Sequence, residues 1–127
     1  MNLVEFRRQL AALARSRPSR TVGIPSRDLP SDWRPYTVMN PESGLLFTEA
    51  SAWNLLVQLL EEGHPILETT LDHPPGARGF VLLVDLEGSR QTLYVKVQLG
   101  ANCVIGRSFH YSYEAGLHGT PRGRRDD

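Results

Sequence analysis

The sequence predicts an α+β fold in which two N-terminal helices pack on an antiparallel meander of three or four strands. Residues 2–15 and 48–62 carry apolar side chains at helical spacing. From residue 66 onward the pattern changes to short apolar or alternating runs separated by turn residues. A chain of 127 residues is long enough for one domain with its own core. We expect the second helix to cover one face of the sheet and to leave the other face open for function.

Capping and helix-breaking residues set the bounds of the two helices. Asn2 is a suitable N-cap for the first helix, and Pro18 lies just beyond its end. Thr48 is the expected N-cap of the second helix, while Gly63 suits its C-terminal end. Trp53 lies on the apolar stripe of this helix, so we expect its side chain in the core.

Between the helices, residues 16–44 are rich in proline, arginine and serine and show no hydrophobic period. We expect a connector without regular structure, which is uncommon in a compact domain and is usually functional or mobile. Trp33 and Tyr36 are its aromatic residues. We expect them to pin the connector to the core; the alternative is that they form a surface on which unpaired nucleic-acid bases stack.

Four strands are predicted in the second half of the chain. Residues 66–71 form a short strand, and residues 80–86 form a nearly continuous apolar run that is typical of a central strand. Residues 91–99 alternate between apolar and polar side chains, as expected for a strand with one buried face. A turn follows at residues 100–102, and the fourth strand begins at Cys103, so the last two strands form a hairpin.

The polar face of this hairpin carries side chains suited to chemistry. If Leu99 pairs with Cys103, then Ser108 lies opposite Tyr94. His110 then lies diagonal to Tyr94, within reach of its hydroxyl. A phenol, a hydroxyl and an imidazole therefore gather on one patch of the sheet.

Lys96 lies on the same polar face, opposite Gly106. Arg107 breaks the alternation, because strict pairing would aim its side chain into the apolar face opposite Val95. A bulge at residues 106–107 would re-aim the guanidinium and place it beside His110, whereas an edge strand would also let it escape. We favour the bulge, which would shift the register proposed above.

Composition bounds the class of protein. The chain has 14 basic and 14 acidic residues, so its net charge does not indicate a nucleic-acid binder, although residues 1–34 carry seven arginines against three acidic residues. That basic segment either contacts phosphates or an acidic partner, or is a solvated N-terminus.

Cys103 is the only cysteine; we expect a small buried side chain on the apolar strand face and no internal disulfide. No long apolar run is present, so we expect a cytoplasmic protein with no membrane partner.

Neither a metal nor a cofactor is indicated by the sequence. The four histidines, at positions 64, 73, 110 and 118, have no ligand-like spacing with each other or with Cys103. The chain also lacks a P-loop, a dinucleotide fingerprint and a nucleophile elbow. We expect His64, His73 and His118 to be solvated, whereas His110 lies within a strand among other polar groups.

Cleavage of RNA without a metal needs a base for the ribose 2′-hydroxyl, cations for the charge that develops at phosphorus, and an acid for the departing 5′ oxygen. Imidazole can serve as the base or the acid near neutral pH. An ordinary exposed polar strand face is the alternative, and residue spacing alone favours that alternative. The residues that suit the chemistry are His110, Tyr94, Lys96 and Arg107 for catalysis, with Arg78 and Ser108 for substrate binding.

Four stretches of the sequence resemble a known group of proteins. They read FTEASAWNLLVQLLEEGHPI, GFVLLVDL, LYVKVQL and VIGRSFHYS, and they span about residues 44–112. Together they resemble the MqsR-type toxins of type II toxin–antitoxin systems, which belong to the RelE-like group of small ribonucleases. The first forty residues lie outside this resemblance, and RelE-like toxins are usually basic, whereas this chain has no net charge.

The resemblance implies a division of the chain and a function. Residues 48–114 would form a RelE-like α+β core, preceded by an N-terminal helix and a Pro/Arg-rich extension at 1–47. Residues 115–127 are rich in glycine, arginine and aspartate, so their composition predicts a disordered tail. It also implies an mRNA interferase that cuts mRNA, free or on the ribosome, and that is neutralised by a cognate antitoxin. The implied site residues are Tyr94, Lys96, Arg107 and His110.

A non-catalytic interaction module is the competing hypothesis. Its exposed sheet face or basic N-terminal arm would bind another protein. This hypothesis predicts no RNA cleavage, and loss of function when Arg7, Arg8 or Trp33 is changed.

Overall fold

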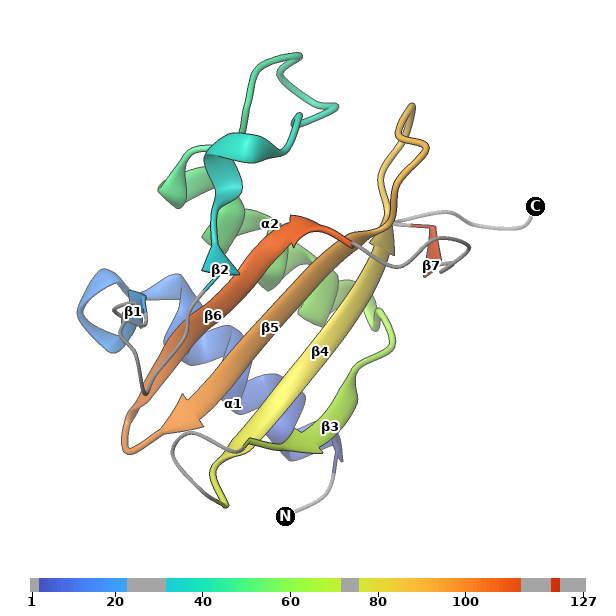
Figure 1. The fold of residues 1–127 in the computed structure, drawn as a ribbon. Coiled ribbons are helices and arrows are strands. Elements are labelled where there is room, and N and C mark those ends of the chain that lie inside the picture. Colours follow the sequence, from blue (N-terminus) through green and yellow to red (C-terminus); the bar gives the residue numbers. More distant parts are fainter. Residues whose placement is uncertain (1–2, 23–31, 72–75, 113–119, 122–127) are drawn as a thin grey trace.

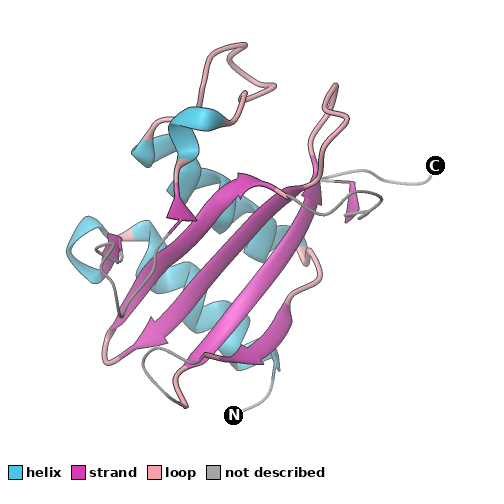
Figure 2. Ribbon diagram, viewed as in Figure 1, coloured by secondary structure: helices cyan, strands magenta, loops and turns pink. Residues whose placement is uncertain are grey.

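The fold has two layers, a β-sheet and a pair of α-helices that lie side by side on one of its faces (Figure 1). The computed structural model describes residues 3–22, 32–71, 76–112 and 120–121. Helix α1 is Leu3–Arg15 and helix α2 is Glu49–Glu62. Figure 2 shows that no helix among the described residues lies on the opposite sheet face, which we call the open face. No helix in these ranges is long and apolar enough to cross a membrane.

The predicted helix bounds are confirmed, and the caps of α2 explain why they are sharp. The Thr48 hydroxyl accepts a hydrogen bond from the Ser51 backbone N–H, and the Ser51 hydroxyl accepts one from the Thr48 backbone N–H. Each side chain therefore satisfies a backbone donor of the other residue. Gly63 ends the helix at φ 83°, a left-handed conformation that costs glycine little. The predicted cap at Asn2 lies outside the described residues.

The predicted antiparallel meander is confirmed for four strands. They are β3 (Leu67–Thr70), β4 (Arg78–Asp85), β5 (Leu93–Gly100) and β6 (Cys103–Tyr111). Each pairs antiparallel with the next along the chain. The α+β class is therefore correct.

Three short strands make the sheet mixed, which corrects the expectation of a purely antiparallel meander. Strands β1 (Arg20–Val22) and β2 (Asp32–Trp33) both pair in parallel with β6, and β7 (Thr120–Pro121) pairs in parallel with β4. The connector expected to lack regular structure therefore holds two strands and the 3₁₀ turns Arg17–Ser19 and Pro35–Thr37. Strands of two or three residues are too short to show an alternating period.

Part of the predicted disordered tail, residues 115–127, is described. Its only described residues are the two that form β7, and the rest lies outside the described ranges. Strand β7 joins the sheet from beyond the β5–β6 hairpin, so the sheet extends past the predicted meander.

Trp33 anchors β2 in the core. Its side chain is 9% exposed, with ring centroids 4.8 Å from Trp53 and 5.4 Å from Phe109. The expectation that Trp33 pins the connector is confirmed, and a buried ring is not available for stacking on bases. Tyr36 behaves differently: it is 62% exposed and does not pin the connector.

The hairpin of β5 and β6 has a register shifted by one residue from the predicted one. Gly100 pairs with Cys103, so the turn is formed by residues 101–102, with Asn102 at φ 55°. The predicted bulge is confirmed: Val97 pairs with residue 106 and Lys96 with residue 108, so Arg107 is the extra residue.

The slip in register explains an error about Cys103. A shift of one residue moves every side chain to the other face of a strand. Cys103 is therefore on the open face and half-exposed, not buried on the apolar face. Its neighbour Val104 takes the core position opposite Leu99.

His64 is buried, which corrects the expectation of a solvated loop residue. Its side chain is 5% exposed, and its Nε2 donates to the Leu83 carbonyl oxygen over 3.0 Å. The Arg7 guanidinium donates to the His64 carbonyl oxygen over 2.7 Å. Burial lowers the pKa of His64 below its ordinary 6.5, and the nearby Arg7 charge acts in the same direction, while the Leu83 hydrogen bond opposes it.

The buried His64 makes stability fall at acid pH. Because its pKa is lowered in the fold, the unfolded chain binds the proton first as the pH drops through 6.5. The contribution of neutral His64 to the free energy of unfolding should therefore be fully present above that pH and be lost progressively below it. In His64→Gln, which keeps a hydrogen-bond donor for Leu83, this part of the decrease should disappear. Urea unfolding at several pH values measures both slopes, and identical slopes would contradict the assignment.

Gly106 leaves room for Trp33, so filling that space should be costly. A Cβ atom at Gly106 would lie 2.7–2.9 Å from three carbons of the Trp33 ring. We expect Gly106→Ala to lower the free energy of unfolding by about 1–3 kcal/mol, because the ring must move within a packed core. The matched control is Gly100→Ala, whose Cβ would meet the Cys103 sulfur, a side-chain atom that can rotate away. Urea titration should show the smaller loss for the control.

Candidate functional site

His110 and Tyr94 form the centre of the candidate site. They are directly paired across β5 and β6, rather than diagonal as predicted. Their rings stack with centroids 5.6 Å apart and planes 20° from parallel. Their strand neighbours Leu93 and Phe109 are fully buried against the helices, so Tyr94 and His110 lie on the open face. The tyrosine ring therefore packs against one face of the imidazole ring.

The hydrogen bonds of His110 fix which ring nitrogen is basic. Its Nδ1 lies 2.8 Å from the Tyr111 carbonyl oxygen. Because a carbonyl can only accept, Nδ1 carries the proton, and Nε2 holds the lone pair in the neutral ring. Nε2 lies 3.9 Å from a carboxylate oxygen of Asp32. If Nε2 takes up a proton, this carboxylate stabilises the resulting positive ring.

Asp32 is a site residue that the sequence reasoning missed. It lies on β2, where it pairs with Ser108, and its other carboxylate oxygen is 3.8 Å from an Arg34 nitrogen. Its neighbour Trp33 points into the core, so Asp32 points to the open face. The only signal in the sequence is its position next to a tryptophan that anchors the chain. Nothing in that signal identifies the strand with which Asp32 pairs.

Lys96 and Ser108 lie one row further along the sheet. They are directly paired, next to the Tyr94–His110 pair on the same face. Neighbouring diagonal positions on a sheet lie about 7–8 Å apart, so the Lys96 ammonium can reach a group bound at His110. This ammonium makes no ion pair or hydrogen bond with the described part of the chain. The structure thus brings together four of the predicted residues: Tyr94, Lys96, Ser108 and His110.

The two predicted arginines do not join this group. Arg107 donates from Nη1 to Gln98 Oε1 over 2.9 Å, so it is directed along the sheet and not toward His110 as expected. Arg78 lies 3.9 Å from a carboxylate oxygen of Glu68, with its guanidinium 4.8 Å from the centre of the Phe6 ring. Because Phe6 belongs to α1, Arg78 lies on the helix side of the sheet. The structure separates Arg78 from the other predicted site residues.

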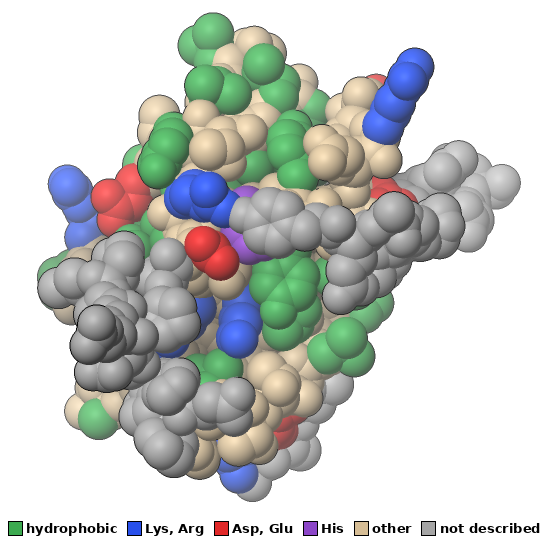
Figure 3. All heavy atoms as spheres, viewed as in Figure 1, with side chains coloured by type: hydrophobic (Ala, Val, Ile, Leu, Met, Phe, Trp, Pro, Cys, Tyr) green, Lys and Arg blue, Asp and Glu red, His purple; other side chains and the backbone are tan. Residues whose placement is uncertain are grey.

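An open groove adjoins the Tyr94–His110 pair. Figure 3 shows basic, acidic and histidine side chains near the middle of the open face, with hydrophobic side chains beside them. The groove has a volume of about 490 Å³, within the range of small-ligand sites. Tyr94 lies between the groove and His110. The groove is lined by Leu67, Glu68, Thr69, Val81, Leu83, Tyr94 and Ser112.

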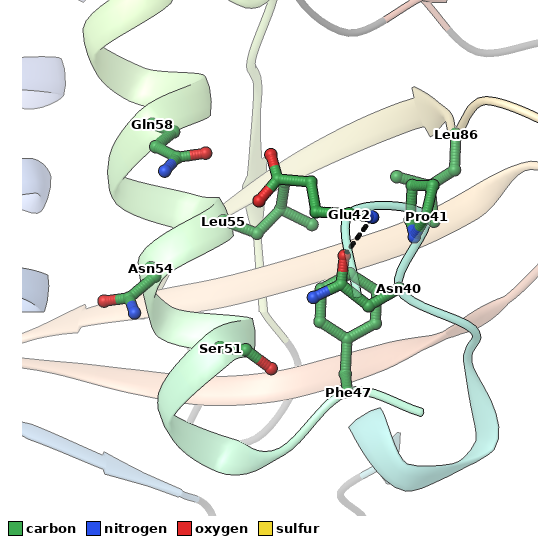
Figure 4. A pocket seen from close by; sticks show the side chains of 9 residues that line it. All are labelled: Asn40, Pro41, Glu42, Phe47, Ser51, Asn54, Leu55, Gln58 and Leu86. Atoms are coloured by element: carbon green, nitrogen blue, oxygen red, sulfur yellow. Dashed lines mark hydrogen bonds between the residues drawn. The ribbon is translucent and has the colours of Figure 1, made fainter. Parts of the chain in front are cut away.

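A second hollow lies between α2 and the loop that precedes it (Figure 4). Its volume is only about 110 Å³, and its rim consists mostly of amide, hydroxyl and carboxylate side chains. Asn40 Oδ1 accepts a hydrogen bond from the Glu42 N–H over 3.0 Å and so shapes the loop. No member of the Tyr94–His110 group lines this hollow.

Within the described ranges, no group of three or more His, Cys, Asp or Glu side chains is arranged to hold a metal ion. His73 and His118 lie outside these ranges. The open-face site is therefore built from an imidazole, a phenol, an ammonium, a hydroxyl and a carboxylate. These groups can transfer protons and bind an anion.

The two buried histidines should differ in tautomer. His110 donates from Nδ1 to the Tyr111 carbonyl, whereas His64 donates from Nε2 to the Leu83 carbonyl. We expect ¹⁵N NMR of the imidazole rings, at a pH where both are neutral, to show the Nδ1–H form for His110 and the Nε2–H form for His64. The same tautomer at both positions would contradict the geometry of one of these hydrogen bonds.

Comparisons with protein-family models, with curated proteins and with solved structures found no match. The resemblance to MqsR-type toxins accordingly stays a prediction.

Proposed function

We propose that this chain is a metal-independent endoribonuclease, the toxin of a toxin–antitoxin system, with a RelE-like fold and a cytoplasmic location. The observation that carries the proposal is the Tyr94–His110 stack, in which the His110 Nε2 holds a lone pair. The Lys96 ammonium lies in the next row of the same sheet face. Cleavage of RNA through its 2′-hydroxyl needs a base for that hydroxyl and a cation for the charge on the phosphate, and these two residues can supply both.

In the first step, His110 Nε2 takes the proton of a ribose 2′-hydroxyl. The freed oxygen forms a bond to the adjacent phosphorus. Asp32 lies 3.9 Å from Nε2 and stabilises the imidazolium that results. Nδ1 donates to the Tyr111 carbonyl oxygen, so Nε2 is the ring nitrogen that takes the proton.

In the second step, the bond between phosphorus and the 5′ oxygen breaks. Lys96 stabilises the charge on the non-bridging phosphate oxygens, and the Ser108 hydroxyl donates to one of them. The Tyr94 hydroxyl gives its proton to the departing 5′ oxygen. The products are a 2′,3′-cyclic phosphate and a 5′-hydroxyl, and the proton held by His110 returns to Tyr94 through solvent.

The partners follow from the resemblance of residues 44–112 to MqsR-type toxins. The substrate is mRNA, free or on the ribosome, and a cognate antitoxin protein neutralises the toxin by blocking the open face. Because the chain has no net charge, its affinity for RNA depends on a few local contacts more than on long-range attraction.

Substitutions at the site should abolish cleavage and leave the fold intact. We expect His110→Gln to lower the rate of RNA cleavage by about 10²–10⁴-fold, the range that proton transfer contributes. Lys96→Met should lower it by about 10²–10³-fold, because one stabilising contact to the developing charge is lost. The assay is cleavage of end-labelled single-stranded RNA in EDTA, with the new termini identified as cyclic phosphate and 5′-hydroxyl.

Two matched variants control this experiment. His64→Gln changes a histidine on the far side of β4, and Arg8→Met changes an exposed cation of α1. Both should cleave RNA at the wild-type rate. If His110→Gln and Lys96→Met are as active as these controls, the site is elsewhere. If the wild-type chain cuts neither free RNA nor mRNA on ribosomes, the nuclease proposal is wrong.

A non-catalytic interaction module is the second candidate, favoured by one exposed segment. Residues 36–46 contain four of the six large hydrophobic side chains that are exposed among the described residues. Hydrogen bonds between the Phe47 N–H and the Val38 carbonyl, and between the Asn40 N–H and the Leu45 carbonyl, hold this segment as a hairpin. The four side chains are Tyr36, Met39, Leu45 and Leu46. This candidate predicts growth arrest without RNA cuts, relieved by Leu46→Ser and not by His110→Gln.

A further inference from the structure

The groove beside Tyr94 is continuous with the candidate site through the sheet register. Leu67, Val81 and Lys96 are paired in one row across β3, β4 and β5. Leu83, Tyr94 and His110 are paired in the neighbouring row. Adjacent strands lie about 4.8 Å apart, so the apolar end of each row is about 10 Å from its polar end.

The groove floor is apolar, and a cation lies beside it. Leu67, which is 59% exposed, lines the groove together with Val81 and Leu83. Glu68 also borders the groove, but it pairs with the buried Phe80 and its carboxylate lies 3.9 Å from Arg78, on the helix side of the sheet. Lys96 lies just outside the groove and would attract a phosphate. The distribution of charge therefore suits a ligand with an apolar part in the groove and an anionic part at Lys96.

We propose that this groove binds one unpaired base of the RNA, next to the phosphate that Lys96 holds. The inference rests on the proposed function and adds a base-binding subsite to it, which only an unpaired base could enter. The base would lie against Leu67, Val81 and Leu83 and contact the edge of the Tyr94 ring. The hydroxyls of Thr69 and Ser112 belong to the lining and can hydrogen-bond to the edge of the base.

The test measures binding with an RNA that cannot be cut. The probe is a short, fluorescently labelled single-stranded RNA whose 2′-hydroxyls are all methylated. Its fluorescence anisotropy is measured as the full chain is added. We expect Leu67→Ser combined with Val81→Thr to raise Kd by about 5- to 100-fold, the range for loss of one base contact. The matched control, Val4→Ser, changes a similarly exposed apolar side chain, 63% exposed, on α1 at the helix side of the sheet, and should leave Kd unchanged.

A second probe tests whether the groove contacts the base itself. Replacing the bases of the RNA by abasic units should weaken binding to the wild-type chain and should weaken binding to the groove variant much less. Equal Kd values for the groove variant and Val4→Ser would overturn the proposal. So would an RNA duplex that binds as tightly as the single strand.

The outcomes separate this inference from the nuclease proposal. Groove-dependent binding of the methylated RNA, without cleavage of ordinary RNA, would support the base site and contradict the nuclease. Cleavage of ordinary RNA with the same KM in wild type and groove variant would support the nuclease and overturn the base site. The urea midpoint of the groove variant checks that it is folded: Leu67 is 59% exposed and Val81 is only partly buried, so both substitutions should leave a midpoint close to that of the wild-type chain.

Discussion

The packing of Trp33 over Gly106 is the contact on which the candidate site depends. A Cβ atom at residue 106 would overlap the indole ring, so only glycine lets the ring lie this close to β6. Trp33 fixes the two-residue strand β2, and neighbouring strand residues point to opposite faces. Burying Trp33 against Trp53 and Phe109 therefore directs Asp32 toward His110. A contact in the core sets the electrostatics of the open face.

The bulge at Arg107 is the second constraint, because it changes which face each residue of β6 occupies. Before the bulge, Val104 and Gly106 face the helices; after it, Phe109 does. Without the extra residue, Phe109 would point to the open face and His110 into the core. Arg107 itself is accommodated by its hydrogen bond to Gln98, so the guanidinium is not left in the apolar layer.

The sequence predicted the parts of the site that lie on long strands. Alternation in 91–99 placed Tyr94 and Lys96 on one face, and His110 lies with them because the one-residue error in the turn register and the bulge at Arg107 cancel. Asp32 could not be predicted, since a two-residue strand has no period and its parallel partner is distant in the chain. The groove could not be predicted either, because it depends on the exposure of Leu67. The side on which Arg78 lies could not be predicted either, because the predicted strand began at residue 80, whereas β4 begins at Arg78, which alternates with the buried Phe80 and so lies on the helix side.

The opposed charges at the site limit what it can bind. A free phosphate at His110 would meet the Asp32 carboxylate, which repels it, while Lys96 attracts it from the next row. A ribose hydroxyl beside a phosphate satisfies both ends, because the hydroxyl is neutral and can lie between Asp32 and His110 while the phosphate contacts Lys96. In the proposed mechanism, the same carboxylate that excludes a phosphate from Nε2 stabilises the imidazolium once the hydroxyl has lost its proton. Under this proposal, the site favours a ribose–phosphate unit over an isolated anion for the same reason that it favours the transition state.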